Sequence, residues 1–226
     1  EFEGDELLLR NNAALLFSKG DRSSHFQSKI RIFKINGVES NQGKDSNEIE
    51  YENITGSLHK QIVDSRKLLR TLLLEHDELN AGSFDNIMPY PEDAWLEGIV
   101  NAVTHRAYNI IGNEILIKIY DDRLEIISPG SLYGYAKLSN LIIYRESRNP
   151  IIAQGLKDLG HVRARGEGID RMYKEMKNYS LLPLKFVNGK EFFKVIFYKE
   201  NVKKIIEEFI NNRQPHYKLE KKKESE

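Results

Sequence analysis

A helix with two chemically different faces constrains the fold of this chain more than any other feature. Within residues 96–106, Glu97, Asn101 and His105 stand four positions apart, so their side chains share one helical face. The apolar residues of this stretch fall on another face, and they are Leu96, Ile99, Val100 and Val103. A fold that contains this helix is therefore expected to bury one side of it and to leave the polar row open to a ligand.

The neighbouring segments predict an α+β fold with a mixed or antiparallel sheet and helices on one face. Residues 115–119 alternate in polarity and lead into Asp121-Asp122, which predicts a hairpin with residues 123–127. Asn188-Gly189 predicts a second hairpin near the end of the chain. Apolar spacing and cap residues predict three further helices, over residues 58–73, over 150–159 after Asn149-Pro150, and over 169–177.

The chain is expected to divide into two units and a tail. Residues 1–88 carry two strand-like runs and a helix, which predicts a small α/β lobe, and Pro89-Tyr90-Pro91 marks its end. Residues 89–199 form the second unit, and residues 200–226 a charged helix with a Lys-rich tail. Because the sequence begins without Met, we expect it to be a fragment or a processed chain.

Composition excludes several classes of function. Lys+Arg and Asp+Glu both number 34, so no global charge favours nucleic acid or an anionic membrane. The absence of cysteine excludes disulfides, thiolate zinc sites and thiol nucleophiles, and fits a reducing compartment. Gly43-Lys44-Asp45-Ser46 is not a phosphate-binding P-loop, so the chain carries no helicase motor of that type. No apolar run could span a bilayer, and we expect a cytoplasmic protein without a membrane partner.

Two groups of residues suggest a nucleotide site. A carboxamide such as that of Asn101 is a suitable ligand for Mg²⁺, and Glu97, one turn earlier, could orient or deprotonate a water. The loop Gly166-Glu167-Gly168 opens a helix, where backbone N–H groups and the helix dipole favour a phosphate, and Arg163 and Arg165 add positive charge. The alternatives are an exposed polar helix face and a simple turn between helices.

Residues 96–132 and 147–172 resemble a known family. Their sequences, LEGIVNAVTHRAYNIIGNEILIKIYDDRLEIISPGSL and SRNPIIAQGLKDLGHVRARGEGIDRM, are similar to the GHKL (gyrase, Hsp90, histidine kinase, MutL) ATP-binding module. The resemblance is to the version in RecG-related proteins and transcriptional regulators, and it covers about residues 90–198. It implies a Bergerat-like α/β sandwich that binds ATP and Mg²⁺, and a homo-oligomer.

In that family the module follows a Schlafen/AlbA-like DNA-binding domain, and residues 1–88 resemble the segment that completes it. The resemblance therefore implies DNA as a partner, through this lobe or through a domain missing from its front. It also implies Glu97 as a catalytic base and Asn101 as the Mg²⁺ ligand. Ser128 stands where the family has an aspartate that reads the adenine amino group. The residues expected to bind the nucleotide are Asn101, His105, Arg106, Ser128, Gly130, Arg163, Arg165, Gly166 and Gly168.

Three functions follow from these observations. The first is an ATP-binding regulatory module of a DNA-associated protein, in which residues 131–148 form a lid over the nucleotide. The second is a nucleic-acid-binding or oligomerisation module that has lost its nucleotide, as Ser128 would permit. The basic clusters at Lys199, Lys203, Lys204 and Lys218 to Lys223 motivate it. The third is an active Mg²⁺-dependent ATPase that uses Glu97 as its base.

Overall fold

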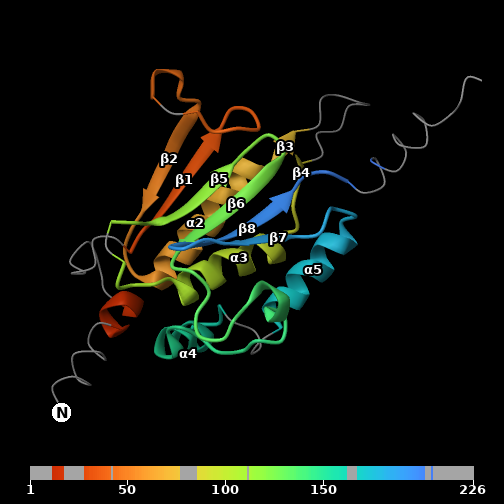
Figure 1. The fold of residues 1–226 in the computed structure, drawn as a ribbon. Coiled ribbons are helices and arrows are strands. Elements are labelled where there is room, and N and C mark those ends of the chain that lie inside the picture. The colour runs from red at the N-terminus through yellow and green to blue at the C-terminus, as the bar shows by residue number, and fades with distance from the viewer. Residues whose placement is uncertain are drawn as a thin grey trace, which may run out of the picture.

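The computed structural model describes residues 12–17, 28–41, 43–76, 86–110, 112–161, 167–201 and 205. Its centre is a mixed sheet of six strands in the order β2-β1-β5-β6-β8-β7 (Figure 1). All neighbouring pairs are antiparallel except β1 and β5, which are parallel. The strands are β1 (Ile30–Ile35), β2 (Glu48–Ile54), β5 (Ile115–Ile119), β6 (Arg123–Pro129), β7 (Lys185–Asn188) and β8 (Phe192–Tyr198). Two further strands, β3 (Glu75–His76) and β4 (Asn86–Ile87), pair only with each other.

Two helices lie along one face of the sheet, and two more lie beside them (Figure 1). The helices are α2 (Leu58–Leu73), α3 (Glu92–His105), α4 (Pro150–Asp158) and α5 (Gly168–Asn178). Helix α3 packs against β6 and α5, and α2 packs against β1, β2 and α3. This arrangement confirms the predicted α+β fold, with a mixed sheet and helices on one face.

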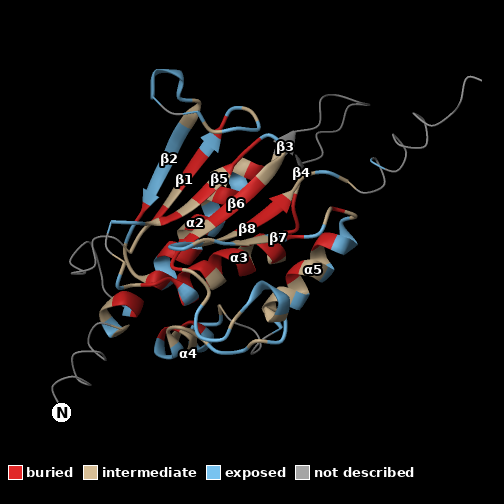
Figure 2. Ribbon diagram, in the orientation of Figure 1, coloured by how far each residue is buried: buried red, intermediate tan, exposed pale blue. Residues whose placement is uncertain are grey.

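The alternation of side chains along the strands explains which face of the sheet the helices cover. Ile115, Ile117 and Ile119 are buried under the helices, whereas Leu116 and Lys118 between them point to the other side. On α3, Trp95, Ile99 and Val103 are completely buried at helical spacing. Figure 2 shows that burial is concentrated in α3 and in the central strands, while β2 at the edge is largely exposed.

Residues from both predicted units share one sheet and one core. Strand β1 comes from the predicted lobe and pairs directly with β5 of the second unit. A single cluster of buried side chains contains residues from both sides of Tyr90, among them Leu69 and Trp95. Among the described residues, no break in the sheet or the core separates the two ranges.

The predicted hairpins and helices are present. Strands β5 and β6 are joined across Asp121-Asp122, and β7 and β8 across Asn188-Gly189. Helices α2, α4 and α5 lie within one residue of their predicted ends. The predicted C-terminal helix and Lys-rich tail fall outside the described residues, except for residues 200, 201 and 205. Within the described ranges, no helix is both long enough and apolar enough to cross a bilayer.

Candidate functional site

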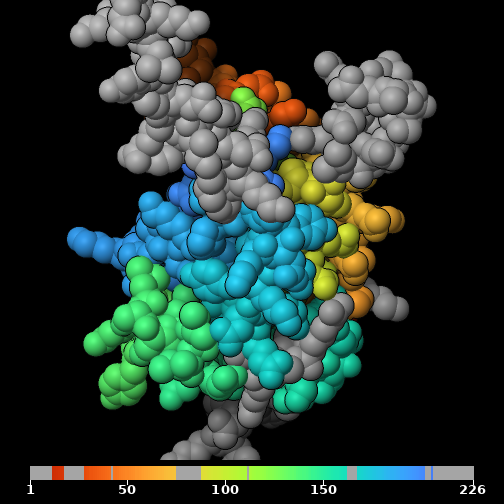
Figure 3. All heavy atoms as spheres, turned by 90° about the vertical axis from the view of Figure 1, so that its right-hand side faces the viewer, coloured from red at the N-terminus to blue at the C-terminus, as the bar shows by residue number. Residues whose placement is uncertain are grey.

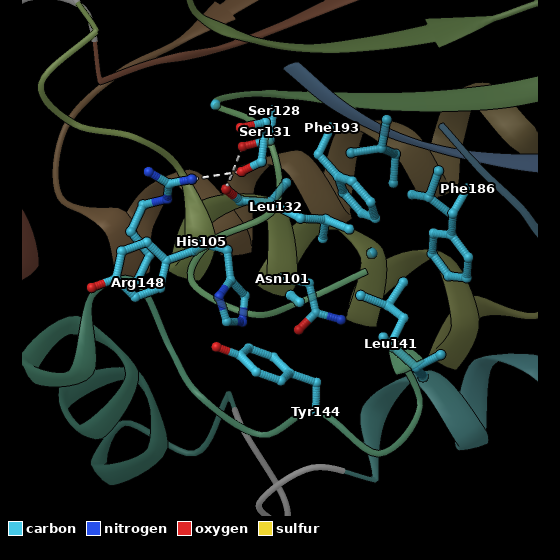
Figure 4. A pocket seen from close by; sticks show the side chains of 18 of the residues that line it. Asn101, His105, Ser128, Ser131, Leu132, Leu141, Tyr144, Arg148, Phe186 and Phe193 are labelled. Carbon is cyan, nitrogen blue, oxygen red and sulfur yellow. Dashed lines mark hydrogen bonds between the residues drawn. The ribbon is translucent and has the colours of Figure 1, made fainter. Parts of the chain in front are cut away.

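The predicted polar row of α3 faces a cavity. This cavity lies between the sheet, α5, α4 and residues 131–148, which we call the lid. Figure 3 shows α5 on the surface, flanked by the lid and by α4. The cavity has a narrow compartment of about 130 Å³ and a wider one of about 700 Å³. Asn101 and His105 line both compartments, so they stand where the two meet (Figure 4).

The narrow compartment is mainly apolar and has aromatic walls. Phe186 and Phe193, from β7 and β8, form a stacked pair with ring centroids 5.7 Å apart. On the opposite side, Gly98 lets α3 approach the sheet closely, because a Cβ there would lie 3.0 Å from Ile126 Cδ1. Met172 of α5 closes a further side. A compartment of this shape and polarity suits a flat aromatic group.

Ser128 supplies a polar group to the narrow compartment. Its side chain is buried, and its Oγ donates a hydrogen bond to the carbonyl oxygen of Ala102, 2.9 Å away in α3. A hydroxyl has one proton, so the remaining capacity of this oxygen is to accept. Ser128 can therefore accept a hydrogen bond from a ligand, without the charge that an aspartate would bring.

Gly130 lets the chain turn tightly at the end of β6. Its φ is +100°, a conformation that side-chain-bearing residues rarely adopt, and its N–H donates to the carbonyl oxygen of Glu191 at 2.7 Å. A Cβ at this position would lie 2.6 Å from the Cβ of Ala107. The predicted Gly130 thus lines the cavity and brings β6 against the end of α3.

The wider compartment carries more polar and charged groups than the narrow one, and its lining comes from four parts of the chain. Helix α3 contributes Glu97 and Thr104, α4 contributes Gln154 and Lys157, and the lid contributes Arg145. Gly168 places the start of α5 in the same wall. Its lining therefore contains two cations, Arg145 and Lys157, and two acids, Glu97 and Glu146.

Glu97 is the most buried acid of the cavity and does not stand alone. Its side chain is 9% exposed and forms an ion pair with Arg171 of α5, whose side chain is 25% exposed. Gly168 packs directly on the Glu97 carboxylate, where any side chain would collide with it. The sequence pointed to Glu97, but its spatial partner is 74 positions away and was not predicted.

His105 is neutral at the entrance between the compartments. Burial of the ring by surrounding protein, followed by the positive charge of Arg148, lowers its pKa from 6.5 to about 4. The part of the His105 side chain that protein does not cover lines both compartments. At neutral pH His105 can donate or accept a hydrogen bond but contributes no charge.

Arg106, predicted beside His105, lies outside the lining of both compartments. Its guanidinium donates from Nη2 to the carbonyl oxygen of Asn113 at 2.6 Å and lies 5.0 Å from the ring of Tyr108. Arg106 is the residue at which α3 ends, and its extended backbone turns the side chain away from the polar row. The structure therefore does not bring Arg106 together with Glu97, Asn101 and His105.

The lid is tied to the cavity at its base. Arg148 donates from Nη2 to the carbonyl oxygen of Ser131 at 2.5 Å, so the two ends of the lid meet (Figure 4). Asn149 was expected to cap α4, but its Nδ2 donates instead to the carbonyl oxygens of Thr104 and Arg106, at 2.9 and 2.8 Å. These bonds satisfy acceptors at the end of α3, a role that cap preferences at the sequence level do not reveal.

Some of the remaining predicted residues lie in the part of the chain that the structure describes, and others lie outside it. Gly168, predicted as part of the glycine loop, lines the wider compartment. Arg163, Arg165 and Gly166 lie outside the described residues. Sequence reasoning also missed Tyr144, whose hydroxyl donates to Glu146 at 2.7 Å inside the lid and which lines both compartments.

Comparison with known proteins agrees with this architecture. Among solved structures, the DIP2311 protein from Corynebacterium diphtheriae has a TM-score of 0.66 at 23% identity, which shows a common fold. The match covers 87% of this chain but 34% of that protein, so the chain spans about a third of its length. A comparison with curated proteins finds no match. Residues 112–197 match the family described as "Putative ATP-dependent DNA helicase recG C-terminal", so this part of the chain is similar to that C-terminal region.

Proposed function

We propose that this chain binds ATP in the two-compartment cavity and acts as a nucleotide-dependent regulatory module of a DNA-associated protein. The position of Asn101 carries the proposal, because this residue lies where an apolar, aromatic-walled compartment meets one that is lined in part by charged side chains. A nucleotide has the same division between a flat base and charged phosphates. The family description of residues 112–197, which names an ATP-dependent DNA helicase, supports both the ligand and the association with DNA.

The chemistry of Asn101 fits a Mg²⁺ ion that accompanies the nucleotide. Its Nδ2 lies 4.0 Å from Met172 Sδ, which leaves the carboxamide oxygen as the group available for a cation. Within the described residues, no cluster of three or more His, Asp or Glu side chains could hold a metal by itself. This agrees with Mg²⁺, which commonly takes few protein ligands and completes its shell with water and phosphate oxygens.

Base recognition in this proposal rests on Ser128. The Oγ proton is engaged with Ala102, so its oxygen accepts from an amino group such as that of adenine and offers no proton to the carbonyl of guanine. A neutral hydrogen bond contributes about 0.5–1.5 kcal/mol, against about 1.5–3 kcal/mol for a charged one. We therefore expect a preference for ATP over GTP that is smaller than an aspartate would provide.

Isothermal titration with Mg-ATP tests the proposal directly. The wild-type chain should bind, and Asn101→Ala should weaken binding at least tenfold, an amount that corresponds to about 1.4 kcal/mol. Asn109→Ala is the matched control, because Asn109 is exposed and lines neither compartment. Absence of binding by the wild type at millimolar nucleotide would refute the proposal.

Hydrolysis of the bound nucleotide is a second candidate function, favoured by Glu97 in the wall of the wider compartment. A carboxylate at this position can orient a water for attack on a phosphate. Turnover should fall sharply in Glu97→Gln if Glu97 is the base, and unchanged turnover would remove it from that role.

A further inference from the structure

The wall that would face the phosphates contains a negative charge, which opposes binding of an anion. We propose that Arg171 is the residue that allows this cavity to accept a polyphosphate, because it neutralises the buried carboxylate of Glu97. This inference rests on the proposed function. Arg171 lies outside the lining of both compartments, so it would act through Glu97 as a positioning and charge-balancing residue.

The burial of Glu97 makes its charge consequential. Two like charges several ångströms apart repel each other far more strongly at a partly buried site than in water, because the effective dielectric constant is lower. Glu97 is 8% exposed and lines the wider compartment. The ion pair with Arg171 offsets this charge, and weakening the offset would increase the repulsion of each phosphate that enters.

The packing of α5 holds Arg171 against this carboxylate. Met172 and Met176 are buried in the core, and they anchor the helix face next to Arg171. Gly168, one turn earlier, permits the close contact between α5 and Glu97. The pairing is therefore built into the junction of α3 and α5 rather than left to a mobile surface side chain.

The other charges of the wider compartment do not replace Arg171. Lys157 and Arg145 are cations of the same compartment, and Glu146 of the lid is an acid that partly offsets them. His105 carries no charge at neutral pH. Removing Arg171 therefore shifts the charge next to the phosphates by one full negative unit.

The test measures binding of adenosine, ADP and ATP at a fixed Mg²⁺ concentration. In Arg171→Met, ATP should bind about tenfold more weakly, ADP less so, and adenosine as in the wild type, because only the phosphates feel the charge. Glu97→Gln should have the opposite effect on ATP, and the double variant should lie near the wild type. Arg171→Lys should recover most of the ATP affinity.

Arg66→Met is the matched control, because Arg66 pairs with Glu92 at 2.6 Å away from both compartments. It should leave all three affinities unchanged. An equal loss for adenosine and ATP in Arg171→Met would show a merely structural role and overturn the inference, as would unchanged ATP binding in a folded Arg171→Met. If Arg171→Met does not fold, Glu97→Gln decides: it must strengthen ATP binding but not adenosine binding. Failure of the wild type to bind any of the three would refute the proposed function itself.

Discussion

Replacing Gly130 by alanine should destabilise the protein by about 1–5 kcal/mol. The left-handed backbone, with φ at +100°, costs an L-residue about 1–2 kcal/mol. The added methyl group would lie 2.6 Å from Ala107 Cβ, and overpacking of this kind costs about 1–3 kcal/mol. A gain of about 0.4–1 kcal/mol, from the reduced entropy of the unfolded chain, offsets part of the sum.

The local hydrogen bonds prevent the chain from relaxing around the new methyl group. The N–H of Ala107 donates to the carbonyl oxygen of Pro129 at 2.8 Å, and the N–H of Gly130 donates to Glu191 at 2.7 Å. Movement of either segment would break one of these bonds. The steric clash between the two methyl groups should therefore lower the free energy of unfolding by nearly its full cost.

Urea and thermal denaturation measure this effect, and Gly112→Ala is the matched control. Gly112 has a φ of +96°, but nothing lies within 4 Å of a Cβ there, so its variant should lose only about 1 kcal/mol. For a chain of this size, Gly130→Ala should lower the melting temperature by roughly 2–20 °C. Adding Ala107→Gly should recover the steric part. Equal destabilisation of the Gly130 and Gly112 variants would refute the reasoning.

Two further changes probe the lid base and the entrance of the cavity. Asn149→Ala should lower the free energy of unfolding by about 1–3 kcal/mol and weaken nucleotide binding, because two hydrogen bonds to the end of α3 are lost. Denaturation and nucleotide titration should both detect the change. An unchanged unfolding curve would contradict this role. For His105, the pKa is lower in the folded state than in the unfolded chain, so the unfolded chain takes up the proton first and stability falls as the pH drops from about 6.5 toward 4. Urea midpoints between pH 4.5 and 7.5 should therefore depend less on pH in His105→Gln, and identical slopes for variant and wild type would contradict the assignment.

Local spacing was sufficient to predict the polar row of α3. The positions of Glu97, Asn101 and His105 follow from helical geometry alone, and all three reach the cavity. Arg106 shows the limit of the same reasoning, because the residue after His105 lies about 100° away from the row and its side chain contacts Asn113 and Tyr108 instead. The hairpins at Asp121-Asp122 and Asn188-Gly189 were equally local, since turn residues specify them.

Contacts between distant segments could not be read from the sequence. The parallel pairing of β1 with β5 depends on how α2 and α3 cross the sheet, and no residue pattern within either strand encodes it. The ion pair of Glu97 with Arg171 likewise exists only because α5 packs against α3. Asn149 stands at a position that predicts a helix cap, but its side chain donates instead to carbonyl oxygens at the nearby end of α3.

Because the base of the lid is closed, the length of the lid can change without disturbing the rest of the protein. Arg148 and Ser131 fix where the segment leaves and returns, so residues inserted between them would extend outward without pulling on the sheet or α3. The entropic cost of such growth is small, about 0.6 kcal/mol for each doubling of loop length. Relatives with this fold can therefore differ widely in the size of this segment, and a reporter peptide could be inserted near Leu138–Asn140 while the core remains intact.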